Sequence, residues 1–179
     1  MAYDFHNLKV ILVEDNFTMR TLVRDVLAAF GIHYVLPVSD GAKAWKELQT
    51  FPADLAIVDW NMRPVSGLRL VQRMRNGADS PNPFLPVIML TAYSERHRVM
   101  RGRDAGVTEF LVKPVTPKRL YDRIVAIIEH NRNFIRSHDY FGPDRRRTDK
   151  GVIGRDRRDP DSLTYIDLEQ FRTPSLLGK

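Results

Sequence analysis

Hydrophobic and polar positions follow two alternating patterns over the first 130 residues. Short, continuous apolar runs alternate with longer segments in which apolar residues recur every three or four positions. The runs are typical of buried strands, and the second spacing is typical of one face of a helix. The apolar runs predict five strands, over residues 8–13, 34–38, 54–58, 86–90 and 110–112. The segments between and after them predict five helices, over residues 16–31, 41–50, 66–74, 94–105 and 116–128.

Local start and stop signals support these helices. Asn16 and Ser66 can each cap a helix through a side-chain oxygen, and Thr116 with Pro117 forms an N-cap and first-turn pair. Gly31 can end the first helix. Strands that alternate regularly with helices predict an α/β fold, whose parallel sheet is covered by helices on both faces.

Polar side chains follow four of the predicted strands, at the point where each strand ends. Glu14 and Asp15 follow the first strand, and Asp59 follows the third. Thr91 follows the fourth strand, and Lys113 follows the fifth. In open α/β sheets, ligands bind beyond the carboxyl ends of the strands, near the point where strand order reverses. We therefore expect these side chains to meet at one edge of the sheet.

The residue types at this edge indicate a particular chemistry. Carboxylates in one pocket repel one another, so such a cluster persists only when a cation or a proton offsets the charge. Oxygen ligands without histidine or cysteine indicate Mg²⁺, which prefers carboxylates together with phosphate. The chain contains no cysteine, which excludes thiolate metal sites, disulfides and cysteine nucleophiles. A lysine and a threonine hydroxyl beside the carboxylates suit a phosphoryl group that arrives on one of them.

Four motifs occur in order along the chain: Glu14-Asp15, Asp59-Trp60-Asn61-Met62, Thr91-Ala92 and Lys113-Pro114. This ordered set resembles the receiver domain of response regulators, the chemotaxis type included. The resemblance covers roughly residues 7–130. It implies a doubly wound, flavodoxin-like sheet of parallel strands in the order 2-1-3-4-5, with helices on both faces.

The resemblance also implies a phosphorylation site and a metal site. Asp59 would accept a phosphoryl group from a histidine kinase, a phosphotransfer protein or a small phosphodonor. Glu14, Asp15, Asp59 and the backbone carbonyl of Asn61 would hold Mg²⁺. A protein of this kind accepts a phosphoryl group and dephosphorylates itself, so it is not an enzyme that turns over an external substrate.

Further roles follow from the same resemblance. Lys113 and Thr91 would assist phosphoryl transfer by contacting the phosphoryl oxygens. Thr91 and Phe110 would form the conformational switch, in which the aromatic ring follows the threonine as it turns inward. Phe110 lacks the hydroxyl group of the commoner tyrosine, so its exposed and buried positions are expected to be less distinct.

Three neighbouring positions affect what we expect of this site. Arg63 stands before Pro64, where many receivers have the proline directly after methionine, so the loop beside the pocket is expected to differ. Tyr93 is bulky for a position that lines the approach of water, which predicts slow autodephosphorylation. Trp60 is expected to be a partly exposed loop residue and a native fluorescence probe.

Basic residues are unevenly distributed. Residues 1–130 hold 17 Lys+Arg and 14 Asp+Glu, and residues 131–179 hold 11 and 8, so each part contributes +3 to the net charge of +6. The predicted helix over residues 94–105 carries four arginines, Arg96, Arg98, Arg101 and Arg103. They form either a solvated face or a docking surface that attracts an acidic protein partner.

The strand and helix pattern stops near residue 131. Residues 131–179 form an Arg/Asp-rich tail with Gly-x-Asp-Arg-Arg at 142–146 and again at 154–158. We expect this tail to be disordered or extended, and residues 163–171 could dock as a short helix or strand. Its role is open between partner binding, packing within the chain or in a homodimer, and nucleic-acid contact. Arginines interleaved with aspartates argue against nucleic acid, because affinity for phosphates depends on net neutralisation.

The tail has too few apolar residues for a DNA-binding output domain. We therefore predict a single-domain response regulator, with its receiver at residues 1–130, that acts on a downstream protein. The chain shows no secretory signal and no apolar run long enough for a membrane span, which predicts a cytoplasmic protein.

Two other functions remain as alternatives. The first is a pseudo-receiver that binds partners without being phosphorylated, although such proteins usually lack an acid or the lysine. The second is a Mg²⁺-dependent phosphatase with an aspartate nucleophile. That class has a D-x-D pattern near the chain start, whereas Asn61 stands two residues after Asp59.

Overall fold

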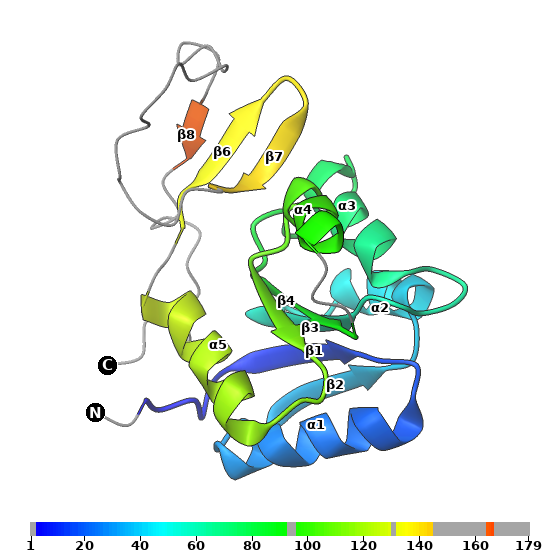
Figure 1. The fold of residues 1–179 in the computed structure, drawn as a ribbon, viewed down its shortest axis with the longest axis vertical. Coiled ribbons are helices and arrows are strands. Elements are labelled where there is room, and N and C mark those ends of the chain that lie inside the picture. Colours follow the sequence, from blue (N-terminus) through cyan, green and yellow to red (C-terminus); the bar gives the residue numbers. More distant parts are fainter. Residues whose placement is uncertain (1–2, 93–95, 130–131, 145–163, 167–179) are drawn as a thin grey trace.

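The structure, a computed structural model, describes residues 3–92, 96–129, 132–144 and 164–166 (Figure 1). Its larger part is a five-stranded parallel sheet in the order β2-β1-β3-β4-β5. The strands are β1 (Lys9–Val13), β2 (Tyr34–Val38), β3 (Leu55–Asp59), β4 (Val87–Thr91) and β5 (Glu109–Val112). The predicted α/β fold and the strand order 2-1-3-4-5 are confirmed.

Within the described residues, five helices connect and follow these strands: α1 (Phe17–Ala29), α2 (Gly41–Leu48), α3 (Gly67–Asn76), α4 (Arg96–Asp104) and α5 (Pro117–Glu129). The side chains of Asn16, Asp40, Ser66 and Thr116 accept backbone N–H groups in the first turns of α1, α2, α3 and α5. These caps satisfy donors that have no partner inside a helix. The caps predicted at Asn16, Ser66 and Thr116 are confirmed, and Asp40 provides a fourth. None of the described helices is both long and apolar enough to cross a bilayer.

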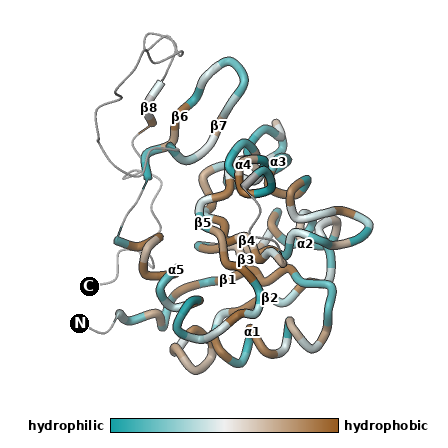
Figure 2. The backbone as a smooth tube through the Cα atoms, viewed as in Figure 1, coloured by the Kyte–Doolittle hydropathy of each residue, from teal (hydrophilic) through white to brown (hydrophobic). Residues whose placement is uncertain are grey.

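Side chains of the central strands alternate between two hydrophobic cores, one on each face of the sheet. On β3, Ala56 and Val58 pack on the side of α2 and α3, whereas Leu55 and Ile57 pack on the side of α1 and α5. Figure 1 shows α1 and α5 on one side of the sheet, opposite α2 and α3. The strands between them form the brown, hydrophobic centre of Figure 2. Because both faces are covered, the polar strand ends are left at the edges of the sheet.

A second, antiparallel sheet follows α5. It consists of β6 (Phe134–Ser137), β7 (Tyr140–Pro143) and β8 (Thr164–Ile166), in the order β7-β6-β8. Phe134 and Phe141, one from each strand of the β6–β7 hairpin, are buried against the larger part of the molecule.

This second sheet adds elements that the sequence pattern did not predict. Strands as short as β6 and β7 have too few apolar positions to show a period. Of residues 163–171, expected to form a short helix or strand, residues 164–166 form β8, and the others lie outside the described residues. Most of the Arg/Asp-rich tail lies outside the described residues, including the second Gly-x-Asp-Arg-Arg copy.

Candidate functional site

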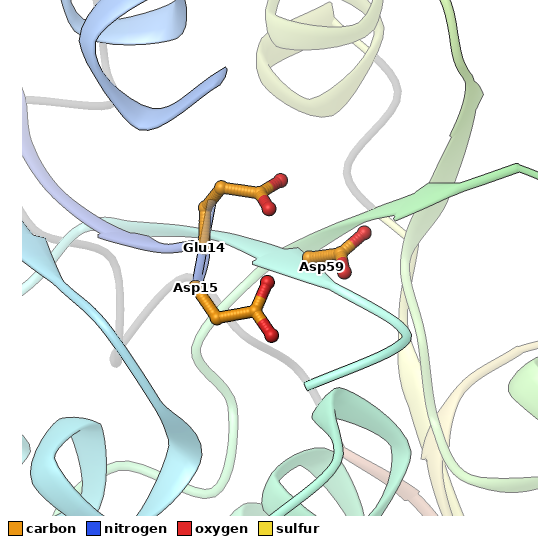
Figure 3. A group of neighbouring side chains, drawn as sticks. All are labelled: Glu14, Asp15 and Asp59. Carbon is orange, nitrogen blue, oxygen red and sulfur yellow. The ribbon is translucent and has the colours of Figure 1, made fainter. Parts of the chain in front are cut away.

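Three carboxylates meet at the carboxyl ends of β1 and β3. Glu14 and Asp15 follow β1 directly, and Asp59 is the last residue of β3. One oxygen from each carboxylate lies within 4.8 Å of the others, and Figure 3 shows Glu14 and Asp15 extending toward the side of Asp59. Glu14 and Asp59 are buried, whereas Asp15 is exposed. The carboxylate cluster predicted for this edge of the sheet is therefore present.

Lys113 enters this cluster from the end of β5. Its Nζ atom lies 2.9 Å from Oε2 of Glu14 and 2.8 Å from Oδ1 of Asp59. The lysine backbone is held in turn by β4, because its N–H donates to the carbonyl oxygen of Thr91 at 2.8 Å. One ammonium group is thus shared between two buried carboxylates.

Two groups of the cluster, Glu14 and Lys113, have shifted pKa values. Burial raises the pKa of Glu14, and the negative charge of Asp59 raises it further, although the bond from Lys113 acts in the opposite direction. Burial alone would lower the pKa of Lys113, but its bonds to Asp59 and Glu14 outweigh burial and raise this pKa. Lys113 is therefore a fixed positive charge at neutral pH.

The backbone around Asp59 is held by close contacts. The N–H of Asn61 donates to Oδ2 of Asp59 at 3.1 Å, so each carboxylate oxygen of Asp59 has a donor. Gly67, the first residue of α3, lies against this turn: a β-carbon there would be 2.1 Å from the carbonyl oxygen of Asp59. Gly67 was not among the predicted site residues, and its position directly after the cap Ser66 is its only signal in the sequence.

Arg20 is a second residue of the site that was not predicted from the sequence. Its Nη1 atom donates to the carbonyl oxygens of Glu14, at 2.6 Å, and Asp15, at 3.4 Å. The carboxylate of Glu14 also accepts the N–H of Asn16 at 3.2 Å. Arg20 thus ties the first turn of α1 to the acidic loop. In the sequence, the only signal for Arg20 is its position five to six residues after Glu14 and Asp15.

The two proposed switch residues lie in different surroundings. Thr91 is buried at the end of β4, beside the backbone of Lys113. Phe110 lies earlier on β5, opposite Met89, and is partly buried. A β-carbon on Gly102 of α4 would lie 2.6 Å from two atoms of the Phe110 ring. The ring therefore packs directly against the backbone of α4.

The expected exposure of Trp60 was wrong. The side chain is only 7% exposed and packs in the core beside α4, where a β-carbon on Gly102 would lie 3.0 Å from it. The small glycine leaves room for two aromatic rings, Trp60 and Phe110, at the same place on α4. The residue after Asp59 thus packs at the same place as Phe110.

The other residues singled out in the sequence differ in how exposed they are. On α4, Arg101 is exposed, and Arg98 and Arg103 are partly buried. The side chain of Arg96 lies outside the described part of the chain, as does Tyr93, so the predicted effect of Tyr93 on dephosphorylation stays a prediction. Arg63 and Pro64 are exposed in the loop after the pocket, and the bond between them is cis.

The site matches the requirements of a hard divalent cation. Glu14, Asp15 and Asp59 together carry more negative charge than Lys113 offsets, and they offer only oxygen atoms. Clustered carboxylates of this kind could hold a metal ion such as Mg²⁺.

Comparison with known proteins identifies the class. The response regulator receiver domain matches residues 10–125. The chain also shares 33% identity over 125 residues with chemotaxis protein CheY1 of Helicobacter pylori, covering 69% of this chain and 99% of that protein. It shares 33% identity over 123 residues with chemotaxis protein CheY-3 of Vibrio cholerae, covering 69% and 93%.

Solved structures agree with this relationship. Chemotaxis protein CheY4 of Vibrio cholerae matches with a TM-score of 0.62 and 29% identity, over 67% of this chain and 98% of that one. A putative response regulator from Chloroflexus aurantiacus matches with a TM-score of 0.61 and 26% identity, over 68% and 98%. The chain belongs to the response regulator receiver family of two-component systems. The strands β6, β7 and β8 lie beyond the matched residues.

Proposed function

We propose that this protein is a response regulator that is switched by Mg²⁺-dependent phosphorylation of Asp59. The observation that carries the proposal is the contact of Lys113 with both Asp59 and Glu14 in the acidic cluster. A preorganised cation in a partly dehydrated site stabilises negative charge far better than water does. Lys113 is thus suited to the charge that a phosphoryl group brings. Membership of the receiver family supports the same function.

The residues that would hold Mg²⁺ are Glu14, Asp15, Asp59 and the backbone carbonyl of Asn61. When bound, the ion offsets the charge that builds on the phosphoryl oxygens during transfer. Asp15 is the exposed member of the cluster, which suits a ligand that meets the ion from the solvent side.

The carboxylate of Asp59 would act as the nucleophile. One of its oxygens attacks the phosphorus of a phosphohistidine, the oxygen–phosphorus bond forms as the nitrogen–phosphorus bond breaks, and the departing imidazole takes up a proton from solvent. The bond from Asn61 N–H to Oδ2 orients the carboxylate before attack. Lys113 moves its contact from the carboxylate to the phosphoryl group, and the hydroxyl of Thr91 donates to a phosphoryl oxygen.

Phosphorylation would then shift an equilibrium between two arrangements of Thr91 and Phe110. A ligand shifts such an equilibrium only by binding one arrangement better than the other. Changing the ratio from about 1:99 to about 99:1 requires roughly 5.5 kcal/mol of differential interaction. Bonds from Lys113, Thr91 and the cation to the phosphoryl group are the sources of this free energy.

The proposal includes the partners. A histidine kinase or a phosphotransfer protein supplies the phosphoryl group in the cytoplasm, and a downstream protein binds the switched form. The basic residues of α4 are the docking surface for an acidic partner, and Arg101 is exposed among those whose side chains the structure describes. Residues 1–130 form the signalling domain, and residues 131–179 are an appendage.

Fluorescence of Trp60 tests the proposal. Trp45 is also buried, so a Trp45→Phe background isolates the signal of Trp60. Mg²⁺, and then beryllofluoride as a mimic of the acyl phosphate, should each change the fluorescence, and acetyl phosphate should form a phosphoprotein.

Asp59→Asn should abolish both the beryllofluoride response and the phosphoprotein. Asp79→Asn, which changes an exposed aspartate in the loop after α3, should leave both intact. A wild-type protein that gives neither response would instead support the pseudo-receiver alternative.

A further inference from the structure

The β6–β7 hairpin packs against the receiver through a cluster of three aromatic rings. Phe134 and Phe141 from the hairpin meet Phe84, which precedes β4, with ring centroids 5.4 to 5.6 Å apart. The two hairpin rings are only 3% and 6% exposed. Desolvated aromatic contacts of this kind contribute strongly to packing. The hairpin is therefore a docked part of the described structure.

Arg75 joins this hairpin to the turn that ends α4. The side chain is 3% exposed, its Nε atom donates to Gly106 O at 3.0 Å, and its guanidinium lies 5.1 Å from the centre of the Phe134 ring. Two further bonds reach the carbonyl oxygens of Pro83 at 2.7 Å and Leu85 at 2.8 Å. One buried cation thus connects α3, the start of β4, the α4–β5 turn and the hairpin.

The hairpin backbone also touches the α4–β5 turn directly. A β-carbon on Gly142 of β7 would lie 3.0 Å from the Cα atom of Gly106. Gly106 has a φ angle of +90°, which only glycine adopts readily, and it follows the last turn of α4. A shift of this turn would change the contact with the hairpin.

An ion pair connects the start of the extension to the switch strand. Glu109 of β5 is buried, and its carboxylate lies 2.7 Å from Nη2 of Arg132 and 3.2 Å from Nη1 of Arg123. Glu109 immediately precedes Phe110. The first described residue of the extension, Arg132, is therefore tied to the residue next to the switch aromatic.

These contacts place α4 and the following turn between the phosphorylation site and the hairpin. At one end, Gly102 packs against Phe110 and against Trp60, the neighbour of Asp59. At the other end, Gly106 packs against the hairpin. A rearrangement of α4 and β5 must therefore repack contacts of the hairpin.

We propose that the docked β6–β7 hairpin stabilises the resting arrangement of the receiver, and that phosphorylation of Asp59 weakens its docking. The docked hairpin coexists with Lys113 paired to Glu14 and Asp59, the pairing that a phosphoryl group would disrupt. By linkage, a hairpin that opposes activation is itself loosened by activation, to the same extent. The proposal rests on the proposed function, because it adds a regulator to the same switch.

Hydrogen exchange on the full-length wild-type protein is the first test, because it needs no variant. Amide exchange over residues 134–143 should become faster when Mg²⁺ and beryllofluoride are added. Exchange that is unchanged or slower would overturn the proposal.

Binding of beryllofluoride to a hairpin variant is the second test. Phe134→Ala combined with Phe141→Ala removes the docking rings and should increase the affinity about 5-fold or more, as is typical of allosteric coupling. Asp139→Asn at the exposed tip of the hairpin is the matched control and should leave the affinity unchanged. Equal affinity in the folded double variant would show that the hairpin serves only as a structural brace.

The outcomes separate this inference from the proposed function. If beryllofluoride does not bind the wild-type protein, both fail. If it binds the wild-type protein but hairpin exchange does not become faster, or the folded double variant binds it with unchanged affinity, only this inference fails.

Discussion

At the scale of single residues, the positive charge of Lys113 offsets the repulsion between the buried carboxylates of the acidic cluster. Its ammonium group is shared between Glu14 and Asp59, which are otherwise buried carboxylates close to each other. Breaking a buried ion pair by removing one partner costs more than the pair contributes, because the remaining charge stays desolvated.

Replacement of Lys113 by alanine is expected to lower the free energy of unfolding in Mg²⁺-free solution by about 1–3 kcal/mol. Saturating Mg²⁺ should restore more stability to this variant than it adds to the wild-type protein, because the ion supplies the missing positive charge. Urea denaturation with and without Mg²⁺ measures both effects. Lys118→Ala, which removes an exposed partner of Asp122, should change stability by less than about 0.5 kcal/mol.

Gly102 is a second position where one residue determines the local packing. Alanine favours a helix over glycine by about 1 kcal/mol, but its β-carbon would meet the rings of Phe110 and Trp60. We expect Gly102→Ala to destabilise the protein by about 1–3 kcal/mol and to change the fluorescence of Trp60. Arg101→Ala, at the exposed neighbouring position, should do neither, and a stabilised Gly102→Ala protein would contradict the observed packing.

At the scale of elements, side chains cap the first turns of four described helices, α1, α2, α3 and α5. Asp40 makes the most extensive cap, since its Oδ1 atom accepts N–H groups from both Ala42 and Lys43 at 2.9 Å. The bond from Lys43 N–H lowers the pKa of Asp40, against the effect of burial, and the bonds from Ala42 and Ser39 lower it further. The charged form of Asp40 is therefore the one that stabilises α2.

The Asp40 cap predicts a pH-dependent contribution to stability. Asp40→Ala should lower the free energy of unfolding by about 1 kcal/mol at pH 7. Since the pKa is lower in the folded state, this contribution is complete above the ordinary aspartate pKa and is lost as pH falls through the folded-state pKa. Unfolding curves of both proteins at several pH values measure the difference. Asp40→Asn keeps an acceptor that does not titrate, so the Asp40→Asn protein should stay more stable than the Asp40→Ala protein at low pH. If this difference in the free energy of unfolding vanished at low pH, the explanation would be contradicted.

At the scale of the whole molecule, the site exists because the sheet brings distant segments together. The order β2-β1-β3-β4-β5 places β1 beside β3 and β4 beside β5, so four loops open at one edge. Glu14 and Lys113 lie 99 residues apart in the chain and are in contact there. A ligand that joins residues of two or more of these loops binds only the folded state and so stabilises the whole fold.

Mg²⁺ is therefore expected to raise the free energy of unfolding. A ligand that binds only the folded state adds about 2.7 kcal/mol at 100 times its dissociation constant. Thermal unfolding at increasing Mg²⁺ should show this rise in the wild-type protein and in Asp79→Asn, but a much smaller one in Asp15→Asn. An equal rise in all three proteins would mean that the ion binds elsewhere.

The sequence alone was sufficient to predict the α/β fold, the caps at Asn16 and Ser66, and the meeting of Glu14, Asp15, Asp59 and Lys113. These features follow from local periodicity and from polar residues at strand ends, which a parallel sheet necessarily brings to one edge. The residue-level roles in phosphoryl transfer stay predictions that the experiments above test.

Only the tertiary structure determined the burial of Trp60, the sharing of Lys113 between two carboxylates, and the docking of the β6–β7 hairpin. Each depends on a contact between residues far apart in the chain, such as Phe84 with Phe134 or Trp60 with Gly102. Local patterns carry no information on which side chain will fill the space that a distant glycine leaves. For the same reason, the sequence alone predicts that an arginine such as Arg75 is exposed, because arginines are mostly exposed. Its burial depends on contacts with Gly106 and Phe134, which only the tertiary structure shows.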